Sequence, residues 1–156
     1  MTDRAPATIQ IGGVLDTRLV PELVAAARAD RGRCGWDEQP LDGALVTSGE
    51  TLEVFATDLT GGRFDELEAF CMARALVFRS RAGGCSGSFG PQRALYDGKG
   101  RARVYQENEE GDVVLSLDSI RKLGSMEAIE RWFAEAEAAT PQLVLVGTAG
   151  PTSGYP

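Results

Sequence analysis

The chain has 156 residues, of which 43% are hydrophobic and 25% charged, and its formal net charge is −7. These values are typical of a single globular domain. They argue against intrinsic disorder and against non-specific binding of the whole chain to nucleic acid or membranes. The sequence contains no histidine, which excludes Ser-His-Asp triads, Cys-His dyads and histidine-ligated metal sites. It also contains neither a Walker A phosphate loop nor the glycine motif of dinucleotide-binding folds.

The first half of the chain alternates between strand and helix patterns. Residues 8–15 predict a strand, and a helix is expected from Pro21, where the missing N–H costs no hydrogen bond. Residues 44–58 hold two strand-like runs around a Ser-Gly-Glu turn. Apolar residues at helical spacing predict a second helix over 63–75, and a strand is expected over 76–81.

The second half of the chain predicts a meander followed by a helix and a last strand. Residues 92–106 predict a hairpin that turns at 97–100, because Asp-Gly supplies the positive φ that a tight turn needs. The run at 113–117 predicts a further strand. Residues 125–139 give the clearest helix, with Ser125 as its N-cap, and the apolar run at 142–146 predicts a buried strand.

This order of elements predicts an α+β fold. We expect one mixed, mostly antiparallel sheet with about three helices packed largely on one face. A doubly wound parallel sheet is disfavoured, because the meander offers no helical crossovers. A single domain over residues 1–146 is expected, with a flexible C-terminal tail over residues 147–156.

The cysteine pattern bears on the compartment. Cys34, Cys71 and Cys85 are odd in number and widely spaced, which indicates reduced thiols in the cytoplasm and not a secreted disulfide framework. No stretch approaches the roughly 20 apolar residues of a membrane helix, and the first residues have no apolar signal core. We therefore expect a cytoplasmic protein with no membrane partner, and no cofactor is predicted.

Basic residues are unevenly distributed along the chain. Seven of the sixteen lie between residues 74 and 103, where Asp97 is the single acid, whereas the remainder of the chain carries 9 basic and 22 acidic residues. Strand alternation places Arg79 and Arg81 on one face of their strand. A tight turn in the hairpin adds Tyr96 to that face and turns Leu95 away from it. The resulting predicted binding surface consists of Arg79, Arg81, Arg93, Tyr96, Arg101, Arg103 and Tyr105.

Two interpretations of this surface remain open. It is a solvated sheet face whose arginines pair with the acidic helices, or it is a recognition face. Arg and Tyr are enriched in interface hot spots, so the recognition hypothesis is a non-catalytic binding or regulatory module for an anionic ligand or an acidic protein. Single-stranded nucleic acid is a further alternative, in which bases stack on the tyrosines and arginines meet phosphates.

The alternative from another class is an enzyme, which we rank below the binding module. Cys85 lies in a glycine-rich stretch with Arg81 and Arg93 nearby, and neighbouring guanidinium groups would lower the pKa of a thiol. Asp16, Asp58 and Asp118 each follow a strand-like run and would hold a metal ion if their strands were parallel neighbours. The competing interpretation is a flexible connection at Cys85 and turn or cap roles for the three aspartates.

Overall fold

The long strand β1 (Arg4–Asp16) is the axis of the fold in the computed structural model, which describes residues 4–34, 39–84 and 90–147. Its residues alternate between the two faces of the sheet, so that Ile9 and Ile11 are fully buried in the core. The part of β1 up to Gly12 pairs with antiparallel neighbours on both sides. From Gly13 onward it pairs in parallel with the last strand of the fold.

The first half of the chain forms a split β-α-β arrangement around this strand. Two successive strand-helix units and a closing strand give the order β2-β4-β1-β5 in the sheet, and β3 pairs with the outer edge of β2. The elements are α1 (Val20–Ala29), β2 (Arg33–Cys34), β3 (Gln39–Pro40), β4 (Leu52–Thr60), α2 (Asp65–Ala73) and β5 (Val77–Ala82), with short 3-10 turns at Thr17–Leu19 and Gly43–Leu45.

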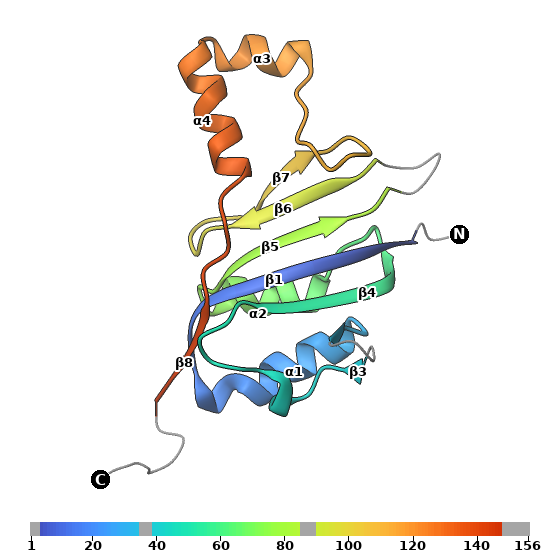
Figure 1. Ribbon diagram of the computed structural model, residues 1–156, viewed down its shortest axis with the longest axis vertical. Coiled ribbons are helices and arrows are strands. Elements are labelled where there is room, and N and C mark those ends of the chain that lie inside the picture. The colour runs from blue at the N-terminus through green and yellow to red at the C-terminus, as the bar shows by residue number, and fades with distance from the viewer. Residues whose placement is uncertain (1–3, 35–38, 85–89, 148–156) are drawn as a thin grey trace.

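The second half of the chain extends the sheet and then crosses to its other side. The hairpin of β6 (Gln92–Tyr96) and β7 (Arg103–Gln106) continues the sheet beyond β5. Two helices follow, α3 (Leu117–Leu123) and α4 (Met126–Ala136), and β8 (Leu143–Val146) returns to pair with the end of β1 (Figure 1).

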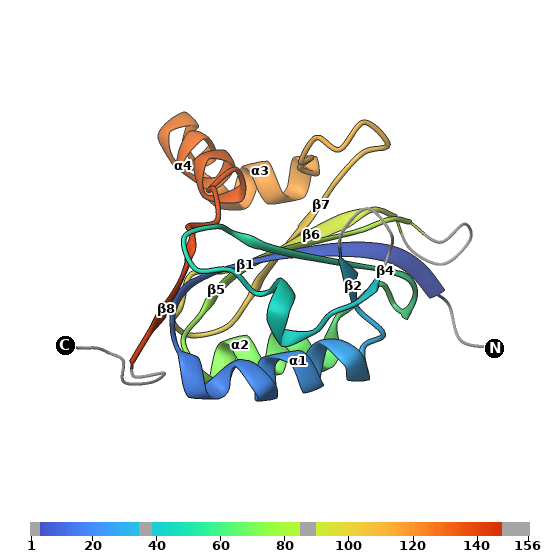
Figure 2. The ribbon, with the colours of Figure 1, turned by 60° about the horizontal axis from the view of Figure 1, so that its bottom comes forward.

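The helices are divided between the two faces of the sheet. Figure 2 shows α1 and α2 beneath the sheet and α3 and α4 above it. The main core lies between the sheet and the lower helices and contains Phe64, Leu67 and Cys71, all fully buried. Burial raises the pKa of the Cys71 thiol to about 12. A smaller cluster on the upper side packs Trp132 and Phe133 of α4 against the sheet.

The predicted α+β class and the single, mostly antiparallel sheet are confirmed. The sheet has eight strands, and four α-helices occur within the described residues, so the helix count is one higher than expected. The additional helix is α3, which occupies part of the run predicted to be a strand at 113–117; there only Val113 makes a β-bridge. None of these helices has the length and apolar character needed to cross a membrane within the described ranges.

Candidate functional site

The upper side of the sheet carries a patch of basic side chains that we call the arginine face. It is formed where three adjacent strands point the same way, and the strand register sets its rows. Arg81 pairs with Arg93, which pairs with Tyr105; Arg79 pairs with Leu95, which pairs with Arg103. The arginine face therefore consists of Arg79, Arg81, Arg93, Leu95, Arg103 and Tyr105.

The expected position of Tyr96 requires correction. The sequence predicts a tight turn that would pair Tyr96 with Arg101, whereas the last observed pair is Leu95 with Arg103, and residues 97–102 form a longer connection. A register shift of one residue reverses the facing of every side chain. The Tyr96 ring consequently lies on the core face, stacked on Phe78 with ring centroids 5.6 Å apart. Tyr96 is also one of the residues that line the cavity at the open end of the arginine face. Leu95 takes its place among the arginines.

Two glycines in this connection adopt backbone angles that few other residues would tolerate. Gly98 and Gly100 have φ angles of 98° and 69°, which side-chain-bearing residues rarely adopt. The Asp97 carboxylate accepts a hydrogen bond from the Lys99 N–H at 3.0 Å, closing a local turn. Arg101 therefore lies in this connection and not in β7.

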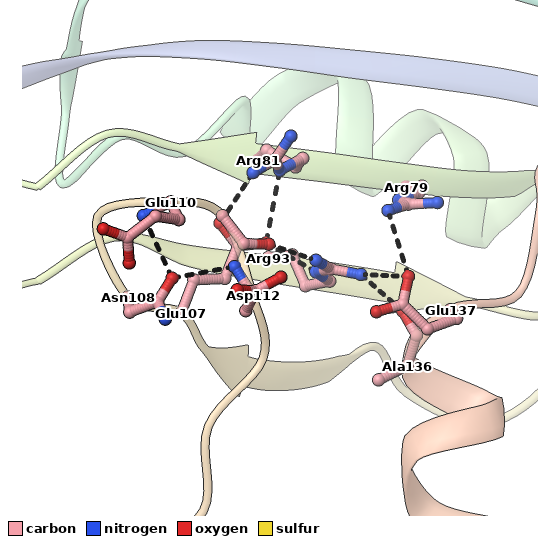
Figure 3. Close-up of polar contacts among 10 residues, drawn as sticks. Arg79, Arg81, Arg93, Glu107, Asn108, Glu110, Asp112, Ala136 and Glu137 are labelled. Atoms are coloured by element: carbon pink, nitrogen blue, oxygen red, sulfur yellow. Dashed lines mark hydrogen bonds and ion pairs between the residues drawn. The ribbon is translucent and has the colours of Figure 1, made fainter.

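One end of the arginine face is closed by acids from the same chain. The side chains of Arg93 and Glu107 are 3% and 2% exposed, and Arg93 Nε lies 2.5 Å from Glu107 Oε2. Glu107 Oε1 forms a second ion pair, with Arg81 Nη2 at 3.1 Å. Arg93 Nη1 donates to the carbonyl of Ala136 at 2.8 Å (Figure 3). Arg93 Nη2 donates to the carbonyl of Gly111 at 2.9 Å. Arg93 is thus a structural residue that fixes the C-terminal end of α4 to the sheet.

The other end of the arginine face opens into a cavity of about 560 Å³. Its floor is the row Arg79, Leu95 and Arg103, and its rim includes Lys99 and Arg101 from the β6–β7 connection. The charged lining residues are four cations (Arg79, Lys99, Arg101 and Arg103) and two acids (Asp97 and Glu135). The cavity is therefore net cationic.

Arg79 is the least compensated cation of the floor. Its side chain is only 22% exposed, and its nearest acid is Glu137, whose Oε1 lies 4.0 Å from Arg79 Nη2. That distance is an ion pair at its outer limit and too long for a hydrogen bond. Figure 3 shows that Arg79 shares Glu137 with Arg93, which lies closer at 3.3 Å. Burial, and after it the charge of Arg93, lower the pKa of Arg79, and the carboxylate of Glu137 only partly offsets them.

Arg103 is better compensated than Arg79. It forms an exposed ion pair with Glu135, with a separation of 3.0 Å. The Tyr105 side chain and then Glu135 raise the pKa of Arg103. Arg79 is therefore the floor cation with most capacity for an added anion.

The wall opposite the strands is the segment 138–141 between α4 and β8, and it is held firmly. A Cβ on Gly12 would lie 1.9 Å from the carbonyl oxygen of Pro141, so the absence of a side chain lets this segment cross β1. Thr51 Oγ1 donates to the same carbonyl at 3.0 Å. Within the described residues, the hydroxyl of Thr140 is the one buried side-chain polar atom without a hydrogen-bond partner, and Thr140 lines the cavity.

A second cavity of about 550 Å³ lies at the opposite end of the same strands, beside Gly83 and Gly84. Its charged lining residues are Arg81 and three glutamates, Glu107, Glu109 and Glu110. Because Arg81 is already paired with Glu107, this cavity is acidic and does not suit an anion.

The remaining candidates from the sequence do not assemble into a site. Cys85 lies outside the described residues. Asp16 and Asp58 lie near opposite ends of β1, where Asp16 pairs with Arg18 and Asp58 with Arg4. Asp118 is on α3, paired with Lys122. The Arg18 side chain lowers the pKa of Asp16 to about 2, so this carboxylate is ionised and already paired with a cation. No metal-binding group of acids or cysteines occurs in the part of the chain that the structure describes.

Glu107 and Glu137 are absent from the surface predicted from the sequence, yet they determine which arginines are paired. A signal for Glu107 exists: it continues β7 two residues beyond Tyr105, and strand alternation places it on the same face as the arginines. Glu137 follows a helix end, where side-chain direction is not readable from spacing.

Comparison of the chain with protein-family models, with curated proteins and with solved structures finds no match. The proposal for its function therefore depends on the geometry of the cavity.

Proposed function

We propose that the protein is a non-catalytic binding or regulatory module that takes a small anionic ligand in the cavity at the open end of the arginine face. The observation that carries the proposal is Arg79, a largely buried guanidinium whose nearest acid stands 4.0 Å away, on the floor of a net cationic cavity. A guanidinium in this state gains more from an anion than an exposed or fully paired one, because most of its contact with water has already been removed.

The size of the cavity favours a small ligand over an acidic protein. Its volume of about 560 Å³ falls within the range of small-molecule sites, about 300–1,000 Å³. A protein partner would need a broad open surface, but Arg81 and Arg93 are occupied by Glu107. Binding of single-stranded nucleic acid has no support in this geometry, because Tyr96 stacks in the core and Tyr105 is buried against Trp132.

Isothermal titration calorimetry with acetate, hexanoate, sulfate and inorganic phosphate at constant ionic strength tests the proposal. We expect at least one of these anions to bind saturably, and Arg79→Gln to weaken that binding about tenfold or more. Arg121→Gln is the matched control, because Arg121 is an exposed arginine on α3 away from the cavity. Failure of all four anions to bind, or equal losses in both variants, would overturn the proposed function.

A further inference from the structure

We infer that the ligand is a small monocarboxylic acid with an apolar body; this inference depends on the proposed function and adds the chemical class of ligand. The first observation is the cross-strand row on the cavity floor. Leu95 stands between Arg79 and Arg103, so the floor alternates cation, apolar side chain and cation across three strands. Such a floor fits a molecule that places a charged head on a guanidinium and an apolar body on Leu95.

The remaining walls extend the apolar surface. Val77 lines the cavity from β5, and Ala138, Ala139 and Pro141 line it from the anchored segment opposite. Sulfate and acetate are too small to cover these apolar walls and would leave most of the cavity unfilled. An apolar body that covers it is stabilised in proportion to the area removed from water.

The charge surrounding the floor favours a single negative charge. The nearest helix end is the C-terminus of α4, whose carbonyl groups carry partial negative charge. Glu135 and Glu137 stand beside it, and Glu135 already occupies Arg103 at 3.0 Å. Lys99 and Arg101 are exposed and therefore screened by solvent. Among the lining residues that the structure describes, only Arg79 is both desolvated and weakly paired, whereas a phosphate dianion needs several such donors.

The test is a chain-length series of straight-chain monocarboxylates, from acetate to octanoate, titrated calorimetrically into the wild-type protein at constant ionic strength. We expect affinity to rise about fourfold for each added methylene until the cavity is filled. The uncharged alcohol of equal length should bind at least tenfold more weakly than its acid, because it lacks the charge that Arg79 receives. Leu95→Thr, which keeps a strand-forming side chain, should flatten the series without abolishing acetate binding.

Four outcomes separate the two proposals. Equal affinity for acetate and hexanoate would overturn the ligand class and leave the proposed anion site standing, as would tighter binding of inorganic phosphate than of hexanoate. Equal affinity for hexanoate and hexanol would overturn both the class and the role of Arg79. If acetate, hexanoate, sulfate and phosphate all fail to bind, the proposed function falls with the inference.

Discussion

The two ends of the arginine face contain the same kind of side chain in opposite electrostatic circumstances. At the closed end, Arg93 is almost fully buried and its donors meet a buried carboxylate and two main-chain carbonyls. At the open end, Arg79 is also largely buried but has only a shared acid at 4.0 Å. The two residues lie on adjacent strands of one sheet face, so local secondary structure does not distinguish them. The difference comes from the positions of two acids. Glu107, after β7, pairs with Arg93, and Glu137, at the end of α4, lies closer to Arg93 than to Arg79.

This difference explains why a count of basic residues is a poor guide to a binding surface. Of the arginines that the sequence places together, Arg81 and Arg93 form ion pairs with Glu107 and stabilise the fold. The interpretation that the arginines pair with the acidic helices describes Arg103, which pairs with Glu135 of α4 at 3.0 Å, and more weakly Arg79, which lies 4.0 Å from Glu137. At the closed end the main acid is Glu107, which follows β7. The proposal of anion binding applies only to the open end.

The largest expected effect is on the closed end, where Glu107→Ala should reduce the free energy of unfolding by about 3–5 kcal/mol, because it leaves Arg93 buried without its carboxylate. Urea denaturation monitored by circular dichroism measures this loss. Glu135→Ala, which removes an exposed acid beside the open end, is the matched control and should cost less than about 1 kcal/mol. Similar losses in the two variants would remove the distinction between the ends.

Replacing both partners sharpens the same comparison. The double variant Arg93→Met with Glu107→Leu should regain most of the stability lost in Glu107→Ala, because no buried charge remains unpaired. Arg81 loses its partner in this variant, but its side chain is 48% exposed and remains solvated. A double variant less stable than Glu107→Ala alone would show that the hydrogen bonds of Arg93 to Ala136 and Gly111 outweigh the ion pair.

An intermediate effect is expected at the wall of the open end. Gly12→Ala should lower the free energy of unfolding by about 1–3 kcal/mol, because its Cβ would overlap the carbonyl oxygen of Pro141. Ligand binding should weaken in the same variant, since segment 138–141 must move. Gly43→Ala is the control, as the nearest atom to its Cβ would be 3.8 Å away. Unchanged ligand affinity in Gly12→Ala would show that segment 138–141 is not part of the binding site.

The ion pair at the rim should contribute little. A double-mutant cycle on Arg103→Ala and Glu135→Ala is expected to give a coupling of about 0.2–1 kcal/mol that shrinks in high salt, because both side chains are at least half exposed. A coupling above about 2 kcal/mol, or one insensitive to salt, would mean that Arg103 stabilises the fold as strongly as Arg93 does.

The smallest expected effect is at Arg79 itself. Arg79→Gln should change the free energy of unfolding by no more than about 0.5 kcal/mol, because the substitution removes a desolvated charge repelled by Arg93. Arg93→Gln, on the adjacent strand, should cost several times more because Glu107 is left buried and unpaired. Chemical denaturation of the two variants side by side measures the contrast, and equal losses would show that Arg79 is structural.

Much of the fold is readable from local patterns. The hairpin at 92–106 follows from Asp-Gly between alternating runs, and α4 follows from its apolar spacing and the Ser125 cap, which accepts the Ala128 N–H at 3.1 Å. The strand predicted at 113–117 is wrong beyond Val113. Ser116 caps α3 instead, and Leu117 remains 60% exposed, so capping and not burial determines that segment.

The site itself was predictable only in part. Alternation correctly placed Arg79 and Arg81 on one face, but the exact length of the turn decided whether Leu95 or Tyr96 joined them. Two positive-φ glycines around Lys99 permit both a tight turn and the longer connection, so local sequence left the register open. The neutralising role of Glu137 depends on tertiary packing at the end of α4, which no local pattern encodes.

The most direct test of the central claim is a titration of the arginine Nε–Hε resonances by nuclear magnetic resonance, with hexanoate added to the wild-type protein. We expect the Arg79 resonance to shift and saturate, while the Arg93 resonance stays within its initial linewidth because the Arg93 donors are already engaged. Arg121 serves as the exposed reference and should not saturate. Equal small shifts of all arginines, or a saturating shift of Arg93 with none at Arg79, would contradict the assignment of the open end as the binding site.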